Sequence, residues 1–258
     1  MSQDTTPADV SPVLSSSDPT RMALAEHLGE LRRRLAICLA AVLIASCVGF
    51  ALAERLIGWL KRPAEGFLPR LAFFSPTEAL VAYLKVAVGF GVVVALPVIL
   101  AQLWAFVRPA LSWRERFYGM AFVWWGSLLF IGGAAFAYVV CLPLFLRFLL
   151  RIGEAQLVPI ISVSRYLGFA TGVMLTCGVL FEVPLAMVFL TRVGLITPAT
   201  LRRQRGIALL GLVVVAAFVT PTTDAISLLL MTIPLLGLYE LAIVVSQWAG
   251  RPPRLSRR

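Results

Sequence analysis

The sequence has few charged side chains and a single histidine. Of its 258 residues, 14% are charged and 60% are hydrophobic, and the mean hydropathy is +0.90. A soluble domain carries about 25% charged residues, so this chain has too few to cover a water-exposed surface. His27 lies outside the apolar stretches, which disfavours a Ser-His-Asp triad. We therefore expect a membrane protein without catalytic residues.

The cysteines give no sign of a disulfide or a metal site. All four lie inside apolar runs, where a cysteine behaves as a small buried hydrophobe. They are Cys38, Cys47, Cys141 and Cys177. We expect no disulfide, no bound metal and no cofactor.

Three long stretches lack any Asp, Glu, Lys, Arg or His, namely residues 35–53, 86–107 and 117–146. About 20 such residues span the hydrocarbon of a bilayer as a helix. A membrane β-barrel would need segments of about ten residues that alternate between apolar and polar. These runs are longer and apolar on every face, so the sequence predicts an all-α integral membrane protein.

We expect six transmembrane helices, preceded by an amphipathic helix at the membrane surface. Asp18-Pro19 resembles a helix start, and leucines recur at helical spacing from Leu24 to Leu35. The spans are expected at about 35–53, 79–106, 117–146, 166–191, 206–219 and 225–245.

Two features of these spans predict a curved bundle. The fifth has about 14 residues, which reach about 21 Å across a hydrocarbon core of about 30 Å, so we expect tilting or local thinning. In addition, four spans contain a proline within them or near an end, and each proline favours a bend. These are Pro97, Pro143, Pro184 and Pro234.

The basic residues predict the side of each loop, because cytoplasmic loops carry the excess of Lys and Arg. The side with both termini holds Arg21, Arg32, Arg33, Arg34, Arg108, Arg114, Arg116, Arg192, Arg202, Arg203, Arg205, Arg251, Arg254, Arg257 and Arg258. The other side holds Arg55, Lys61, Arg62, Arg70, Arg147, Arg151 and Arg165. Both termini are therefore expected in the cytoplasm. The basic residues behind the net charge of +10 then set the topology and contact anionic lipid headgroups, and we expect no nucleic-acid partner.

The chain divides into three parts. Residues 1–19 have neither the basic start nor the apolar core of a signal peptide, and we expect a disordered tail. Residues 20–248 form the membrane domain, and residues 249–258 form a basic cytoplasmic tail.

Two ionisable groups lie within or near the predicted spans. Glu182 is near the middle of the fourth, where a charge costs about 2.5 to 3.5 kcal/mol, so it should not face lipid. One interpretation is that the Glu182 carboxyl group joins two helices by hydrogen bonding. The other is that it is a site for a partner protein, a substrate or a transferred proton. Lys85 is near the outer end of the second span and can reach the interface, with Glu78 on roughly the same face.

Glu30 and Glu115 are acidic residues among arginines on the cytoplasmic side. Arg34 lies four residues after Glu30, so surface ion pairs worth under about 1 kcal/mol are one interpretation. The other is that each carboxylate accepts a guanidinium of a basic ligand in bidentate fashion, which would select arginine over lysine.

The sequence resembles the TatC family, the core subunit of the twin-arginine protein translocase. The matching positions, in order, are residues 27–35, 74–78, Lys85, Pro97, 102–111, 115–116, 136–138, 181–184, 220–221, Asp224, Pro234 and 239–240. Their order and spacing carry the resemblance. One departure is Leu228, where the family often has a glutamine.

The resemblance implies a receptor in the bacterial cytoplasmic (inner) membrane that binds twin-arginine signal peptides and helps export folded proteins, driven by the proton gradient. It implies a concave bundle that self-associates and works with the single-span subunits TatA and TatB. The signal-peptide residues would be Glu30, Glu115, Arg32, Gln102, Trp104 and Phe106. The residues for partner contact would be Glu182, Asp224 and Tyr138.

Two other functions would use some of the same residues. A proton- or ion-coupled transporter of small solutes could use Glu182 and Asp224 but predicts inverted repeats, and the two halves show no convincing correspondence. A membrane hydrolase with Lys85 as base would need a serine in a supporting motif, which the sequence lacks.

Overall fold

The computed structural model describes residues 19–65, 71–110, 119–153, 161–192, 194–219 and 225–249. Nearly all of these residues are helical. The longer helices are α1 (Pro19–Ala51), α3 (Pro76–Val107), α4 (Gly119–Phe136), α5 (Leu142–Gly153), α6 (Val163–Phe181), α7 (Val183–Arg192), α9 (Arg205–Val219) and α10 (Ala225–Ala249). The shorter elements are α2 (Ala53–Lys61), α8 (Pro198–Arg203), 3-10 turns at Arg62–Ala64 and Arg108–Ala110, and a π-helical turn at Ala137–Cys141.

Within the described residues, four helical segments are long and apolar enough to cross a membrane: His27–Ala51, Pro76–Val107, Gly119–Leu150 and Val163–Arg192. Arg205–Ala217 of α9 and Met231–Gln247 of α10 are shorter apolar stretches, although α10 as a whole has 25 residues. The first four predicted spans are therefore confirmed as helices of sufficient length. The fifth is short, as predicted, since α9 has 15 residues.

The structure does not separate an interfacial helix from the first span. Helix α1 runs without a break for 33 residues. Along its described amino-terminal part, Leu28, Leu31 and Leu35 are all exposed, so no partner covers the predicted leucine face. The amphipathic helix therefore stays a prediction.

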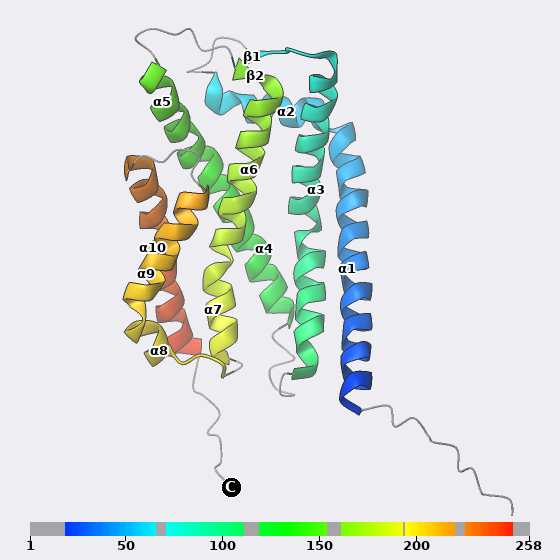
Figure 1. Cartoon of the computed structure of the whole chain (residues 1–258), viewed down its shortest axis with the longest axis vertical. Coiled ribbons are helices and arrows are strands. Elements are labelled where there is room, and N and C mark those ends of the chain that lie inside the picture. Colours follow the sequence, from blue (N-terminus) through cyan, green and yellow to red (C-terminus); the bar gives the residue numbers. More distant parts are fainter. Residues whose placement is uncertain are drawn as a thin grey trace, which may run out of the picture.

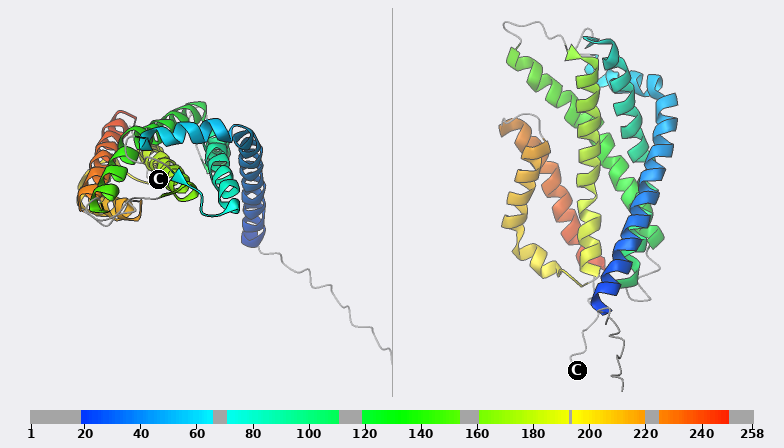
Figure 2. Two further views of the ribbon diagram at one scale, coloured as in Figure 1. Left: turned by 90° about the horizontal axis from the view of Figure 1, so that it is seen from above. Right: turned by 45° about the vertical axis from the view of Figure 1, so that its right-hand side comes forward.

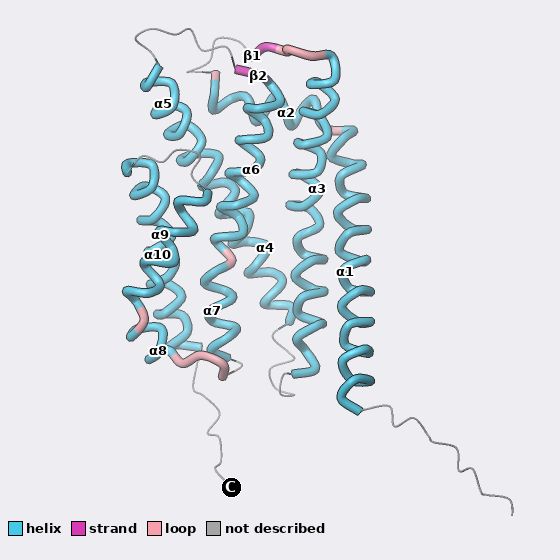
Figure 3. Tube along the Cα trace, in the orientation of Figure 1, coloured by secondary structure: helices cyan, strands magenta, loops and turns pink. Residues whose placement is uncertain are grey.

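One departure from the all-α prediction is a small parallel sheet at the α2 end of the bundle, which the distribution of basic residues predicts to be the outer end (Figure 3). Strand β1 (Leu71–Ala72) pairs with β2 (Ile161–Ser162), with Leu71 opposite Ile161. It joins the segment before α3 to the segment before α6 at the end where α2 lies (Figure 1).

Two of the four prolines coincide with helix interruptions. Pro143 is the second residue of α5, directly after the π-helical turn, and Pro184 is the second residue of α7, after the break at Glu182. In the first turn of a helix, proline loses no intrahelical hydrogen bond. Pro97 and Pro234 instead lie inside continuous helices.

The main core lies around α5, α6 and α10, while α1 and α9 stand on opposite sides of the bundle (Figure 2). Gly133 allows α4 to approach α6 closely, because a Cβ there would lie 2.6 Å from the Cys177 carbonyl oxygen. At the outer end, α2 is held by Tyr166, whose hydroxyl donates to the Leu60 carbonyl oxygen at 2.6 Å.

Candidate functional site

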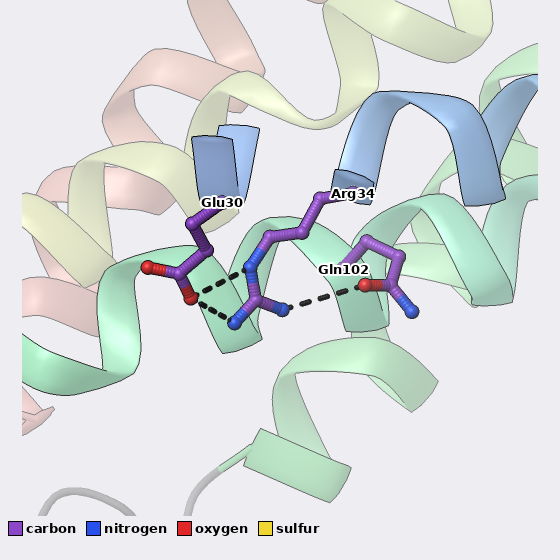
Figure 4. Close-up of polar contacts among 3 residues, drawn as sticks. All are labelled: Glu30, Arg34 and Gln102. Atoms are coloured by element: carbon purple, nitrogen blue, oxygen red, sulfur yellow. Dashed lines mark hydrogen bonds and ion pairs between the residues drawn. The ribbon is translucent and has the colours of Figure 1, made fainter. Parts of the chain in front are cut away.

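A polar cluster links α1 to α3 (Figure 4). Arg34 donates to Glu30 Oε1 from Nε at 3.0 Å and also from Nη2, and its Nη1 donates to Gln102 Oε1 at 3.4 Å. The Glu30 and Arg34 side chains are 34% and 21% exposed, so a ligand can reach them. Both bonds from Arg34 go to the same oxygen, and no described residue donates to Glu30 Oε2. The cluster can therefore accept a further hydrogen-bond donor.

The sequence of α1 and α3 explains this arrangement. Residues four apart share a helix face, so Glu30 and Arg34 point the same way. Gly91 brings α3 against α1, because a Cβ there would overlap the Ser46 hydroxyl and lie 2.9 Å from the Val42 carbonyl oxygen. Gln102 comes eleven residues after Gly91, about three helical turns on, and so reaches the amino-terminal half of α1.

Two predicted aromatic residues pack near this end of α3. Phe106 stacks on His27 of α1 with ring centroids 4.5 Å apart. Trp104 packs against Phe122 of α4 and Phe189 of α7, at 5.2 and 5.6 Å. Phe106 therefore lies beside α1, whereas Trp104 holds three helices together.

Three further predicted site residues are Arg32, Glu115 and Asp224. Arg32 is exposed on α1, and neither of the ion pairs found in the described ranges involves it. Glu115 and Asp224 lie outside the described residues. Of the predicted residues, the structure therefore brings Glu30 and Gln102 together, through Arg34. It does not describe Glu115 or Asp224.

Glu182 lies at the break between α6 and α7, in apolar surroundings. Its Oε1 is buried and has no hydrogen-bond partner among the described residues. Gly126 of α4 leaves room for the carboxyl group, because a Cβ there would lie 3.1 Å from Glu182 Oε2 and 2.6 Å from Leu100 Cδ1. No described side chain satisfies this group, so the interpretation of Glu182 as a hydrogen-bonded link between helices has no support in these contacts.

Tyr138 is tied to α2. Its ring stacks on Trp59 with centroids 4.0 Å apart, and its hydroxyl donates to the Trp59 carbonyl oxygen at 2.9 Å. Its side chain is therefore engaged within the protein.

A second polar cluster lies at the outer end. Glu78 accepts from the Ser162 hydroxyl, from Ser164 N at 3.3 Å and from Phe74 N at 2.8 Å. Lys85 Nζ donates to the hydroxyl and carbonyl oxygens of Ser164 at 3.2 and 3.4 Å. Lys85 and Glu78 thus bind the start of α6, and this contact accounts for Lys85 better than snorkelling does.

Sequence reasoning missed two parts of the first cluster. It treated Arg34 only as a surface partner of Glu30, and it set His27 aside because of its position. The contacts with Gln102 and Phe106 join residues that are far apart in the chain, and spacing along one helix carries no signal for them.

Among the described residues, no group of three or more His, Cys, Asp or Glu could hold a metal ion.

Comparisons with known proteins give a consistent result. Residues 26–234 match the family model of the Sec-independent protein translocase protein TatC. The chain is 36% identical over 237 residues to the Sec-independent protein translocase protein TatCy of Bacillus subtilis, covering 92% of this chain and 93% of that protein. It is 39% identical to TatC of Listeria innocua, covering 89% and 93%. A crystal structure of the twin-arginine translocase receptor TatC superposes with a TM-score of 0.76 at 38% identity, covering 85% of this chain and 99% of that one.

Proposed function

This chain belongs to the TatC family of Sec-independent protein translocase proteins, and on that basis we propose that it is the receptor and core subunit of a twin-arginine translocase. It binds twin-arginine signal peptides at the cytoplasmic face and, with TatA- and TatB-type subunits, exports folded proteins using the proton gradient. The matched relatives are protein translocases, which favours this function over transport of small solutes.

The observation that carries the proposal is the carboxylate of Glu30. It is partly exposed, it already binds one guanidinium, and Oε2 has no donor among the described residues. An arginine of the signal peptide docks on Oε2, with Gln102 and the exposed Arg32 at the edges of the surface. Glu115 supplies the second carboxylate. Because Arg34 occupies Oε1, the ligand guanidinium binds Oε2 through two of its N–H groups, and the ammonium of lysine, a point charge, does not match this forked geometry.

We propose that the partner subunits contact the chain at Glu182. A buried carboxyl oxygen without a hydrogen-bond partner is costly, and a donor from a neighbouring single-span helix would remove that cost. Asp224 and Tyr138 belong to the same docking region by resemblance to the family. The chain also self-associates in the complex.

The proposed topology has six membrane crossings in a concave bundle in the bacterial inner membrane, with both termini cytoplasmic and the start of α1 at the membrane surface. The short α9 crosses where the bilayer is thinned, beside α10. The chain makes no covalent change in its cargo and is not an enzyme.

The test is export of a folded reporter that carries a twin-arginine signal peptide, in cells whose own gene for this protein is deleted. The reporter should stay in the cytoplasm, and the wild-type gene should restore export. Glu30→Gln should fail to restore it, whereas Glu240→Gln, which removes another carboxylate, should succeed. Export of the reporter in the deletion strain would contradict the proposal.

A further inference from the structure

A pocket of about 490 Å³ lies between α8 and the end of α10, away from Glu30 and Glu182. Its lining residues are Pro198, Ala199, Arg202, Arg203 and Gln247. The volume falls within the range of about 300 to 1,000 Å³ that is typical of small-molecule sites.

Helix α8 is fixed in place. The Thr197 side chain caps it by accepting from Thr200 N at 3.1 Å. Leu201 is buried, and its carbonyl oxygen accepts from the Tyr239 hydroxyl of α10 at 2.7 Å. The backbone that carries Arg202 and Arg203 is therefore held in place.

The pocket combines positive charge with unused hydrogen-bond donors. Arg202 and Arg203 are exposed, and within the described ranges neither has an acidic partner. Glu240 of α10 is already bound by Arg205, at 2.7 Å. Gln247 Nε2 is buried and has no hydrogen-bond acceptor among the described residues. An anion with several acceptor oxygens would satisfy all three side chains.

The surroundings point to a lipid as the source of that anion. α8 connects two apolar helices, and it lies at the end of the bundle where α10 ends and α1 begins (Figure 1). Leu195 before α8 and Ile207 after it are 72% and 71% exposed, so apolar side chains flank the pocket. Basic pockets between helices at a membrane boundary bind anionic headgroups. An acidic protein segment would gain nothing from the exposed apolar flanks.

We propose that this pocket binds the phosphodiester headgroup of an anionic phospholipid in the leaflet that meets this end of the bundle. The two guanidinium groups bind the phosphate oxygens, and the Gln247 amide donates to the same group. The acyl chains pass along the apolar flank that includes Ile207. This site does not depend on the signal-peptide surface.

The test is native mass spectrometry of the full chain in nonionic detergent, titrated with phosphatidylglycerol. Phosphatidylcholine and inorganic phosphate at the same concentrations form the other two arms. The variants are Arg202→Gln/Arg203→Gln and Gln247→Leu. The charge-matched control is Arg257→Gln/Arg258→Gln in the basic tail.

The wild-type chain should retain phosphatidylglycerol in preference to phosphatidylcholine. The double variant should lose about 25-fold in affinity, at about fivefold for each arginine. Gln247→Leu keeps the net charge and should lose about tenfold, as expected for a hydrogen bond to a charged group. The tail control should bind as the wild type does.

Three results would overturn the proposal. Equal losses in the pocket variant and the tail control would mean that only net charge matters. Displacement of phosphatidylglycerol by equimolar inorganic phosphate would identify a free anion as the ligand. Wild-type affinity in Gln247→Leu would show that the lipid does not bind in this pocket. This variant also tests the proposal if the double variant does not fold.

Discussion

Arg34 binds one oxygen of the Glu30 carboxylate and leaves the other free of donors among the described residues. The pair is partly exposed, so it adds under about 1 kcal/mol to the free energy of unfolding. Its value therefore lies in orienting the carboxylate: Arg34 also binds Gln102, which fixes the Glu30 side chain between α1 and α3. A ligand guanidinium then meets a carboxylate that is already in place.

The proposed topology predicts which residues a membrane-impermeant thiol reagent can reach. In intact cells, Lys61→Cys should react from outside, because Lys61 ends α2 at the outer end. Arg33→Cys and Arg203→Cys should react only after the membrane is permeabilised, so that the reagent reaches the cytoplasmic side. The parent chain, with its four native cysteines, gives the background signal. Labelling of Arg203→Cys in intact cells would contradict the topology.

The close approach of α4 to α6 predicts a stability difference between adjacent glycines. Gly133→Ala would place a Cβ 2.6 Å from the Cys177 carbonyl oxygen, so the backbones must move apart. We expect a loss of about 1 to 3 kcal/mol in the free energy of unfolding. Gly132→Ala is the matched control, because nothing lies within 4 Å of its Cβ position. Thermal unfolding in detergent measures both, and equal midpoints would contradict the close packing.

Removing the carboxyl of Glu182 should separate partner binding from folding. Glu182→Leu replaces a buried oxygen that lacks a described partner with an apolar group, so stability should stay the same or rise by about 1 kcal/mol. Site-specific crosslinking to the single-span subunits should fall sharply. Thr171→Val removes another buried oxygen without a partner and should leave crosslinking unchanged. Full crosslinking in Glu182→Leu would remove Glu182 from the partner site.

The outer cluster predicts a local change in backbone protection. Glu78→Gln replaces a carboxylate that accepts from the Ser162 hydroxyl and from the amides of Ser164 and Phe74. Amide hydrogen exchange at Phe74 and Ser164 should become faster, while exchange in α10 stays the same. Glu54→Gln on α2 is a control that removes the same charge nearby. Unchanged exchange at both amides would show that Glu78 does not hold this end together.

The membrane helices could be predicted because hydrophobicity and length alone specify them. Pro143 and Pro184 indicated bends, and each lies in the first turn of a new helix beside an interruption. Helix α2 and the β1–β2 pair could not be predicted, because a nine-residue helix and two-residue strands carry too little periodicity. Residues four apart share a helix face, so the pairing of Arg34 with Glu30 could be predicted. Gln102 is far from Arg34 in the sequence, so their contact could not be predicted.

The most direct test of the central claim is the affinity of a twin-arginine signal peptide for the purified chain, compared with the same peptide carrying two lysines. The wild-type chain should prefer the arginine peptide by about tenfold or more, since a guanidinium makes one more hydrogen bond to a carboxylate than an ammonium does, and each such bond contributes about 1.5 to 3 kcal/mol. Glu30→Gln/Glu115→Gln should bind both peptides equally weakly, whereas Glu240→Gln should keep the preference. Undiminished preference for arginine in the Glu30→Gln/Glu115→Gln chain would contradict the account.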